Sequence, residues 1–163
     1  NAAHYGLAEL EKDFDVTIIT QNIDDLHERA GSTNILHLHG EILKMRSERD
    51  PELIYPVTSD IRLGDKAEDG SQLRPYIVWF EEPVPMMELA VPIVNRADLF
   101  VVVGTSLVVY PAAGLVNYTR QGIPLFVLDK KLPYIPDNGF LTCIEKPATE
   151  GINLLRSKLT HFS

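Results

Sequence analysis

The feature that most constrains this fold is a pair of short, almost entirely apolar runs in the second half of the chain. Residues 98–103 read DLFVVV and residues 125–128 read LFVL. Runs without alternating polar residues are typical of strands that are buried on both faces. Helical patterns at 86–96, 111–120 and 149–159 alternate with them. Such alternation indicates right-handed βαβ crossovers, so we predict an α/β fold with a parallel sheet and helices on both faces.

Further elements are expected around these runs. Residues 41–73 differ from the rest, because charged and turn residues dominate there and apolar residues are few. This composition predicts a small insertion with short strands or hairpins. We therefore predict one domain, with a core formed by residues 1–40 and 74–163 and the insertion between them. The other expected elements are helices at 1–12 and 24–30 and strands at 16–20, 34–38, 76–80 and 140–144.

Composition excludes several classes of protein. The 163 residues suit one domain with a substantial core. A formal net charge of -8 argues against nucleic-acid binding, because phosphate contacts need clustered Lys and Arg. The single cysteine, Cys143, excludes an internal disulfide and a Cys-rich zinc site, which fits a reducing cytoplasm. We also expect no membrane span and no signal peptide, because neither pattern occurs.

A cluster of polar residues follows the first predicted strand. Gln21, Asn22 and Asp24 come directly after the run VTIIT. Open α/β sheets bind ligands beyond the carboxyl ends of their strands, and amides with a carboxylate can hold a ribose diol and a carboxamide. The alternative is a capping and turn cluster before the helix at 24–30, with Asp24 or Asp25 as N-cap.

Two histidines lie on the next apolar run, ILHLHG. His39 precedes Gly40, and its imidazole can accept a proton from a hydroxyl near neutral pH. The alternative is a histidine hydrogen-bonded in a turn. His37 points to the same face as His39, and one hypothesis for this pair is a zinc site with His27 and Asp24. A partly buried strand residue is the simpler interpretation of His37.

Small and acidic residues follow the two apolar runs. The sequence Gly104-Thr105-Ser106 comes directly after the run at 98–103. Backbone N–H and hydroxyl groups at such a position can bind phosphate oxygens, although a tight turn is an equal alternative. Asp129 ends the run at 125–128, where a carboxylate can accept both hydroxyls of an adenosine ribose.

Three segments together resemble one family. They are TQNID-x-LH-x-x-AG followed by LHG (residues 20–40), RPYIVWFEEPVP (74–85) and GTSLVVYPAAGL (104–115). In this order they closely resemble the sirtuins, which are NAD-dependent protein-lysine deacylases, and most closely a bacterial type without zinc. The resemblance implies a Rossmann-like sheet, NAD as co-substrate and an acylated lysine in a protein or peptide as the partner.

The resemblance assigns roles around nicotinamide. His39 aligns with the general base, which relays a proton from the ribose hydroxyls after the acyl oxygen has attacked C1′ and displaced nicotinamide. Gln21 aligns with a residue that contacts the nicotinamide ribose, and Asn22 with one that helps hold the ribose and the catalytic water. Asp24 with Ile23 aligns with the pair that binds the nicotinamide amide.

The resemblance also assigns the rest of the cofactor site. It places NAD phosphates and adenosine ribose against Gly104, Thr105 and Ser106. Asp129 stands where the family usually has Asn, which changes the detail of the ribose contact. Cys143 lies where the family packs adenine; judged from the residue alone, a small buried side chain is the stronger interpretation.

The implied substrate site involves Val78, Trp79, Phe80 and Val108. In the family, the peptide adds as a strand beside these residues and the acyl-lysine enters an apolar tunnel. Without the resemblance, VWF is a core strand. Glu81 stands where the family has Gly. If φ is positive there, Glu81 costs on the order of 1 kcal/mol, and it adds negative charge beside the peptide groove.

Two larger departures concern whole segments. Most family members hold a structural zinc with two Cys-x-x-Cys pairs in the insertion, but residues 41–73 contain no cysteine. We therefore expect no zinc, and an insertion held by a small apolar cluster. The GAGxS and GIPDFR-like segments do not occur, so we expect the first βα unit of the nucleotide fold to be absent from this sequence.

The resulting prediction is an NAD-dependent protein-lysine deacylase that transfers the acyl group to ADP-ribose and releases nicotinamide. The alternatives are a mono-ADP-ribosyltransferase, which shares the nicotinamide-ribose chemistry, and a non-catalytic fragment that binds NAD or ADP-ribose.

Overall fold

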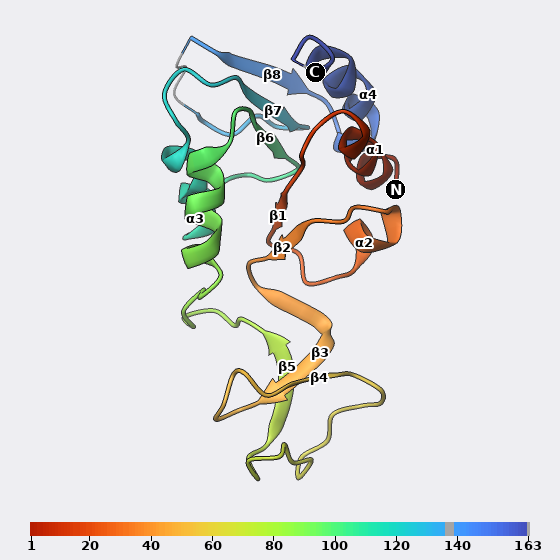
Figure 1. Cartoon of the computed structure of the whole chain (residues 1–163), viewed down its shortest axis with the longest axis vertical. Helices are drawn as coiled ribbons and strands as arrows, with labels where there is room; N and C mark the ends of the chain where they lie inside the picture. The colour runs from red at the N-terminus through yellow and green to blue at the C-terminus, as the bar shows by residue number, and fades with distance from the viewer. Residues whose placement is uncertain (136–138, 163) are drawn as a thin grey trace. The chain divides into compact units, whose positions relative to one another are not determined.

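The computed structural model describes residues 1–135 and 139–162, which form two compact units. The larger unit comprises Asn1–Ile19, Leu26–Leu36 and Met87–Ser163, and the smaller unit comprises Thr20–Asp25 and His37–Met86. The insertion predicted at 41–73 lies within the smaller unit, and its boundaries stay a prediction. In chain order (Figure 1) the elements are α1 (Ala2–Glu9), the 3₁₀ helix η1 (Leu10–Lys12), β1 (Ile18–Thr20), α2 (Leu26–Ala30), β2 (Ile35–His37), β3 (Gly40–Ser47), β4 (Ile54–Pro56), β5 (Leu73–Ile77), α3 (Met87–Arg96), β6 (Phe100–Val103), the 3₁₀ helix η2 (Ala112–Tyr118), β7 (Leu125–Asp129), β8 (Leu141–Glu145) and α4 (Ala148–Leu159).

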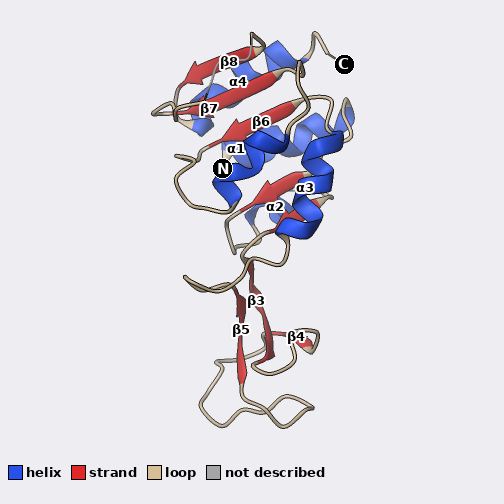
Figure 2. Ribbon diagram, turned by 90° about the vertical axis from the view of Figure 1, so that its left-hand side faces the viewer, coloured by secondary structure: helices blue, strands red, loops and turns tan. Residues whose placement is uncertain are grey.

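The predicted parallel sheet is present in the larger unit. Its strand order is β6-β7-β8, and both strand pairs are parallel. Every residue of the central strand β7 is buried, which confirms the burial inferred from its apolar sequence. Figure 1 shows α3 on one side of these strands and α1 and α4 on the other, an arrangement that Figure 2 shows from the side. The predicted α/β architecture is therefore confirmed.

Helix α4 packs closely on this sheet. The contact is close because Gly151 has no side chain: a Cβ there would lie 2.2 Å from Leu128 Cδ1. Ile152, on the same helix, fills the space beside Gly6 of α1, where an added Cβ would meet Ile152 Cγ1 at 2.2 Å. The buried cluster comprises Leu10, Phe126, Leu128, Ile144, Ile152, Leu155 and Leu159.

Backbone hydrogen bonds join β1 to β2 as a two-stranded sheet. The N–H of Ile18 donates to the carbonyl of Asn34 at 2.9 Å, and the N–H of Leu38 donates to the carbonyl of Thr20 at 2.9 Å. The short helix α2 ends at Ala30, the predicted end of the helix at 24–30, and is followed by Gly31 with φ 103°.

The smaller unit is built on an antiparallel sheet with strand order β4-β3-β5. The strand expected at 76–80 is therefore shifted and belongs to this sheet as β5, which ends at Ile77. Gly40 opens β3 with φ 82°, and a Cβ there would lie 2.1 Å from the carbonyl oxygen of Tyr76. Only glycine allows the two backbones to approach this closely.

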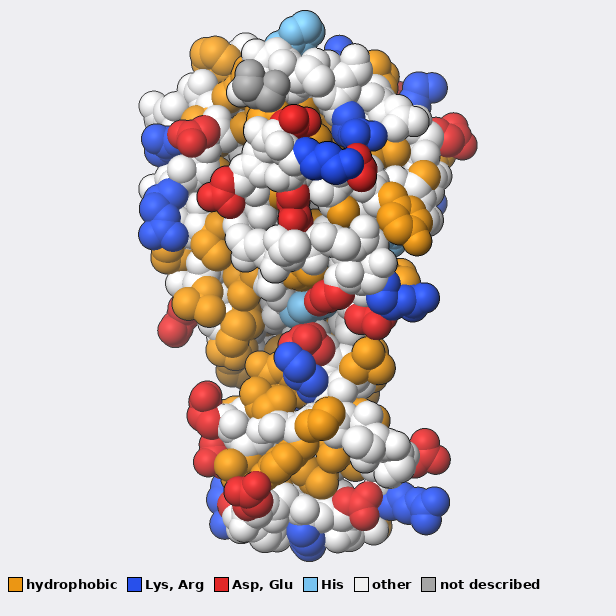
Figure 3. All heavy atoms as spheres, turned by 45° about the vertical axis from the view of Figure 1, so that its right-hand side comes forward, with side chains coloured by type: hydrophobic (Ala, Val, Ile, Leu, Met, Phe, Trp, Pro, Cys, Tyr) orange, Lys and Arg blue, Asp and Glu red, His pale blue; other side chains and the backbone are white. Residues whose placement is uncertain are grey.

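A polar side chain occupies the centre of the predicted insertion. Within residues 41–73, only Ser47 and Ala67 are buried, and Ser47 has no exposed surface. Apolar side chains are exposed instead, among them Ile42, Leu43 and Leu63, and Figure 3 shows such side chains between charged ones over the smaller unit. The expected apolar cluster is therefore wrong, because this short segment has too few apolar residues to enclose one.

Ser47 forms a hydrogen-bonded cluster with Asp69 and Ser71. Its hydroxyl lies 2.7 Å from Asp69 Oδ2 and 2.6 Å from Ser71 Oγ, and it accepts the N–H groups of Arg49 and Asp50 at 3.1 and 3.0 Å. Asp69 Oδ1 accepts the N–H of Ser71 at 2.9 Å. These bonds tie the end of β3 to the loop before β5.

The helix expected at 111–120 is a 3₁₀ helix, η2. Its hydrogen bonds span three residues, as from the N–H of Gly114 to the carbonyl of Pro111 at 3.0 Å. Gly114 near its centre disfavours an α-helix, and Thr119 ends the segment in an extended conformation. In contrast, α3 continues to Arg96 as predicted, with Pro92 inside the helix.

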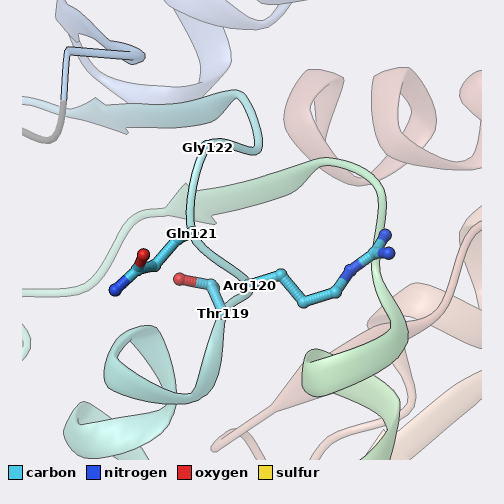
Figure 4. A pocket seen from close by; sticks show the side chains of 4 residues that line it. All are labelled: Thr119, Arg120, Gln121 and Gly122. Carbon is cyan, nitrogen blue, oxygen red and sulfur yellow. The ribbon is translucent and has the colours of Figure 1, made fainter.

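A surface hollow follows η2 and is lined by Thr119, Arg120, Gln121 and Gly122 (Figure 4). The side chain of Arg120 extends away to the end of α3, where it donates to the carbonyl of Ala97 at 3.0 Å and pairs with Asp98. The hollow contains none of the predicted site residues, and we assign it no function. Within the described residues, no helix is both long and apolar enough to span a bilayer.

Candidate active site

His39 lies between β2 and β3 in the smaller unit and is half-buried. Its Nδ1 lies 3.1 Å from the carbonyl oxygen of Gln21. A carbonyl oxygen can only accept, so Nδ1 carries the proton and donates it. In the neutral ring, Nε2 then presents its lone pair. This tautomer is the one that a general base requires.

His37 forms a second bond of the same kind. Its Nδ1 lies 3.0 Å from the carbonyl oxygen of Asn22. The two rings thus hold the backbone of residues 21 and 22, His37 from the end of β2 and His39 from the turn that follows it. For His37 this bond supports the interpretation as a partly buried strand residue.

The segment that carries the predicted amides and carboxylate is fixed at both ends. The N–H of Asn22 donates to Thr20 Oγ1 at 3.1 Å, and the carbonyl of Ile23 accepts the N–H of Ile42 at 2.8 Å. Asn22 is exposed, whereas Gln21, Ile23 and Asp24 are half-buried. The structure therefore brings these four residues together around the strand end that bears His39.

In the larger unit, the predicted phosphate-binding residues follow β6. Gly104 has φ 63° and is exposed, but its N–H donates to the carbonyl of Leu128 at 3.0 Å. This N–H extends the sheet, and the phosphate-binding role of Gly104, Thr105 and Ser106 stays a prediction. Thr105 Oγ1 accepts the N–H of Leu107 at 3.2 Å, and Ser106 is exposed. The hydroxyls of Thr105 and Ser106 remain the polar groups at this turn.

Asp129 ends β7 at the same edge of the sheet. The register pairs Val103 with Leu128, so Asp129 and Gly104 both lie one residue beyond that pair. Asp129 is only 9% exposed, and its Oδ1 accepts the N–H of Lys131 at 2.9 Å. Cys143 on the neighbouring strand β8 is exposed, so its interpretation as a small buried residue is wrong.

Three of the four predicted peptide-binding residues are exposed, whereas Val78 is half-buried. Trp79 is 52% exposed, Phe80 93% and Val108 70%. The alternative that VWF is a core strand is wrong for Trp79 and Phe80, because β5 ends before them. The N–H of Val78 donates to the carbonyl of His39 at 2.9 Å, which joins this segment to the predicted base.

Two charged residues beside this segment escaped the sequence analysis. Arg74 donates Nη1 to Glu82 Oε1 at 2.7 Å and Nη2 to Glu82 Oε2 at 3.0 Å. The bond from Arg74, and then the N–H of Trp79, lower the pKa of Glu82 to about 2. Two opposite charges on either side of a short apolar segment were the available signal, but they lie eight positions apart and only the turn brings them together.

Comparison with known proteins decides the family. The model of the Sir2 family matches residues 1–111. The chain belongs to the Sir2 family. A protein of this family from Bacteroides thetaiotaomicron, named NAD-dependent protein deacylase, is 49% identical over 165 residues, which covers 98% of this chain and 70% of that protein. A relative of the same name from Helicobacter pylori strain 26695 is 50% identical, and the match covers 100% of this chain and 71% of that relative.

Solved Sir2 structures share the fold. One complex, described as Sir2 with a p53 peptide and NAD+, superposes with a TM-score of 0.79 at 35% identity, covering 100% of this chain and 71% of that one. The Sir2 resemblance inferred from the three sequence segments is thus confirmed, and so is the fold class.

Proposed function

We propose that this Sir2 chain provides catalytic and binding residues of an NAD-dependent protein-lysine deacylase. The relatives carry the name of that activity, and a solved Sir2 complex contains a peptide and NAD+. The observation that carries the proposal is the bond from His39 Nδ1 to the carbonyl of Gln21, because it leaves Nε2 as the proton acceptor. The individual residue roles below are parts of this proposal.

NAD supplies an ADP-ribosyl group with nicotinamide as its leaving group. His39 accepts a proton at Nε2 from a ribose hydroxyl of the substrate. Gln21 and Asn22 bind the nicotinamide ribose, and Asn22 also holds the water that completes the reaction. Ile23 and Asp24 bind the nicotinamide amide, since a backbone and a carboxylate can accept from its N–H groups.

The edge of the parallel sheet suits the remainder of NAD. Thr105 and Ser106 provide hydroxyls for phosphate oxygens beside Gly104, where nothing lies within 4 Å of an added Cβ. Asp129 accepts the adenosine ribose hydroxyls, and Cys143 lines the adenine position with its exposed side chain. Asp129 is almost completely buried, so water competes only weakly for the hydrogen bonds that its carboxylate forms.

The protein partner is a chain with an acylated lysine. We assign peptide contacts to Val78, Trp79 and Phe80 of the smaller unit and to Val108 of the larger unit. The exposed apolar surface of Trp79, Phe80 and Val108 is what such a peptide covers. In this proposal the protein uses NAD as its co-substrate and holds no zinc. Cys143 as the sole cysteine favours a cytoplasmic location.

A substitution of the base tests the function. In the full-length protein we expect His39→Ala to lower kcat for an acyl-lysine peptide by about 10²–10⁴-fold, with the fold intact by circular dichroism. His161→Ala, an exposed histidine far along the chain, is the matched control and should keep wild-type turnover. Near-normal activity of His39→Ala would contradict the assignment. ADP-ribosylated protein without deacylated peptide would contradict deacylation.

A further inference from the structure

We infer that Arg74 and Glu82 are positioning residues for the acyl-peptide site. Their ion pair holds the turn that presents Trp79 and Phe80 to the substrate. This inference rests on the proposed function, since it concerns the affinity of the same site for its peptide. All of the groups involved belong to the smaller unit.

The pair is bidentate and partly shielded from water. Both terminal nitrogens of Arg74 donate to separate oxygens of Glu82, at 2.7 and 3.0 Å. Parallel bonds of this kind fix direction as well as distance. The side chains are 21% and 34% exposed, in contrast to 68% and 45% for the surface pair of Lys12 and Glu9. Solvent and salt therefore screen this pair less than an ordinary surface pair.

Glu82 also fixes the backbone of the turn. Its Oε2 accepts the N–H of Trp79 at 3.0 Å, while its own N–H donates to the carbonyl of Trp79 at 3.1 Å. Residues 79–82 thus form a turn closed by one main-chain and one side-chain bond. Glu81 occupies the third position with φ 72°, a conformation that costs a non-glycine residue free energy. The bonds to Glu82 offset this cost and keep the turn in one shape.

The same pair reaches the strand end that precedes the turn. Arg74 Nη2 donates to the carbonyl of Ile77 at 3.4 Å. Val78 lies between the two anchored residues, Ile77 and Trp79, and donates its N–H to the carbonyl of His39. Arg74 and Glu82 therefore hold both sides of the residue that connects the peptide segment to the base.

Kinetics of two variants test this role in the full-length protein. Glu82→Gln removes the charge, and Arg74→Lys keeps the charge but loses the bidentate geometry. We expect each to raise KM for an acyl-lysine peptide about tenfold, with kcat at saturating peptide and KM for NAD within about twofold of wild type. Glu52→Gln, an exposed residue of the same unit, is the matched control and should leave all three constants unchanged.

The outcomes separate this inference from the proposed function. An unchanged peptide KM in both variants, with an active wild type, overturns the positioning role and leaves the deacylase function standing. A fall in kcat and in melting temperature without a change in KM indicates a merely structural pair and also overturns it. If the wild type shows no deacylation, the proposed function fails. Calorimetry with the same peptide then tests the positioning role by itself. Weaker peptide binding by both variants than by the wild type supports this role, whereas equal or absent binding overturns it.

Discussion

At the scale of single residues, Glu81 is the position at which this chain departs most clearly from its resemblance to the sirtuins. A positive φ at Glu81 is expected to cost free energy, and φ is indeed 72° there. A non-glycine residue in the left-handed region loses about 1–2 kcal/mol, while glycine loses about 0.5–1 kcal/mol more conformational entropy on folding than other residues. The two effects oppose each other, and the strain is the larger.

We therefore predict that Glu81→Gly stabilises the fold by up to about 1 kcal/mol. Urea denaturation of the wild type and the variant measures the change in free energy of unfolding. Glu52→Gly is the control, since its φ is not positive. It should lose about 0.5–1 kcal/mol, because there glycine adds only entropy to the unfolded chain. Equal destabilisation by both substitutions would show that the turn at Glu81 is not strained.

At the scale of elements, the hydrogen bonds of Ser47 determine how β3 joins the loop before β5. The bond from Ser47 is the main cause that lowers the pKa of Asp69 from 3.8 to about 2, and the N–H of Ser71 adds to it. A lowered pKa means that the folded protein holds the carboxylate more strongly than the unfolded chain does. The stabilisation is present above pH 3.8 and is lost as the pH falls towards 2.

Asp69→Asn should therefore reduce stability at pH 5 and lose less stability than the wild type between pH 4 and about 2. Thermal unfolding across this pH range measures the difference. Glu82 contributes to acid sensitivity in the same range, in the wild type and the variant alike, so the difference between them isolates Asp69. Asp60→Asn, an exposed carboxylate of the same unit, serves as the control. Parallel pH curves for wild type and Asp69→Asn would contradict the prediction.

At the scale of the whole molecule, we predict that this chain differs from most family members by having no structural zinc in its insertion. Residues 41–73 contain neither cysteine nor histidine, so they lack the sulfur and nitrogen donors of structural zinc sites. The donor set does not fit zinc. The polar cluster of Ser47, Asp69 and Ser71 joins the same segment by hydrogen bonds instead.

Removal of metal should thus leave the protein unchanged. After treatment with EDTA we expect the same melting temperature and the same deacylation rate, and elemental analysis of untreated protein should find zinc well below one equivalent. A family member with the four cysteines is the control and should lose stability under the same treatment. Stoichiometric zinc, or a fall in melting temperature after chelation, would show that the chain has ligands outside this segment.

The sequence by itself determined the parts of this protein that depend on local pattern. The apolar run at 125–128 indicated a strand buried on both faces, the spacing of helices and strands indicated the parallel sheet, and the three motif segments indicated the Sir2 family. Hydrophobic periodicity and motif order are properties of neighbouring residues, so they need no knowledge of distant contacts.

Only the tertiary structure decided which groups already have hydrogen-bond partners and which side chains are exposed. The N–H of Gly104 belongs to the sheet, the VWF segment lies mostly beyond β5, and the centre of the insertion is polar rather than apolar. The ion pair of Arg74 with Glu82 and the tautomer of His39 depend likewise on groups brought together by chain turns. Each of these facts depends on how residues separated in sequence come together in the fold, and local pattern alone does not specify those contacts.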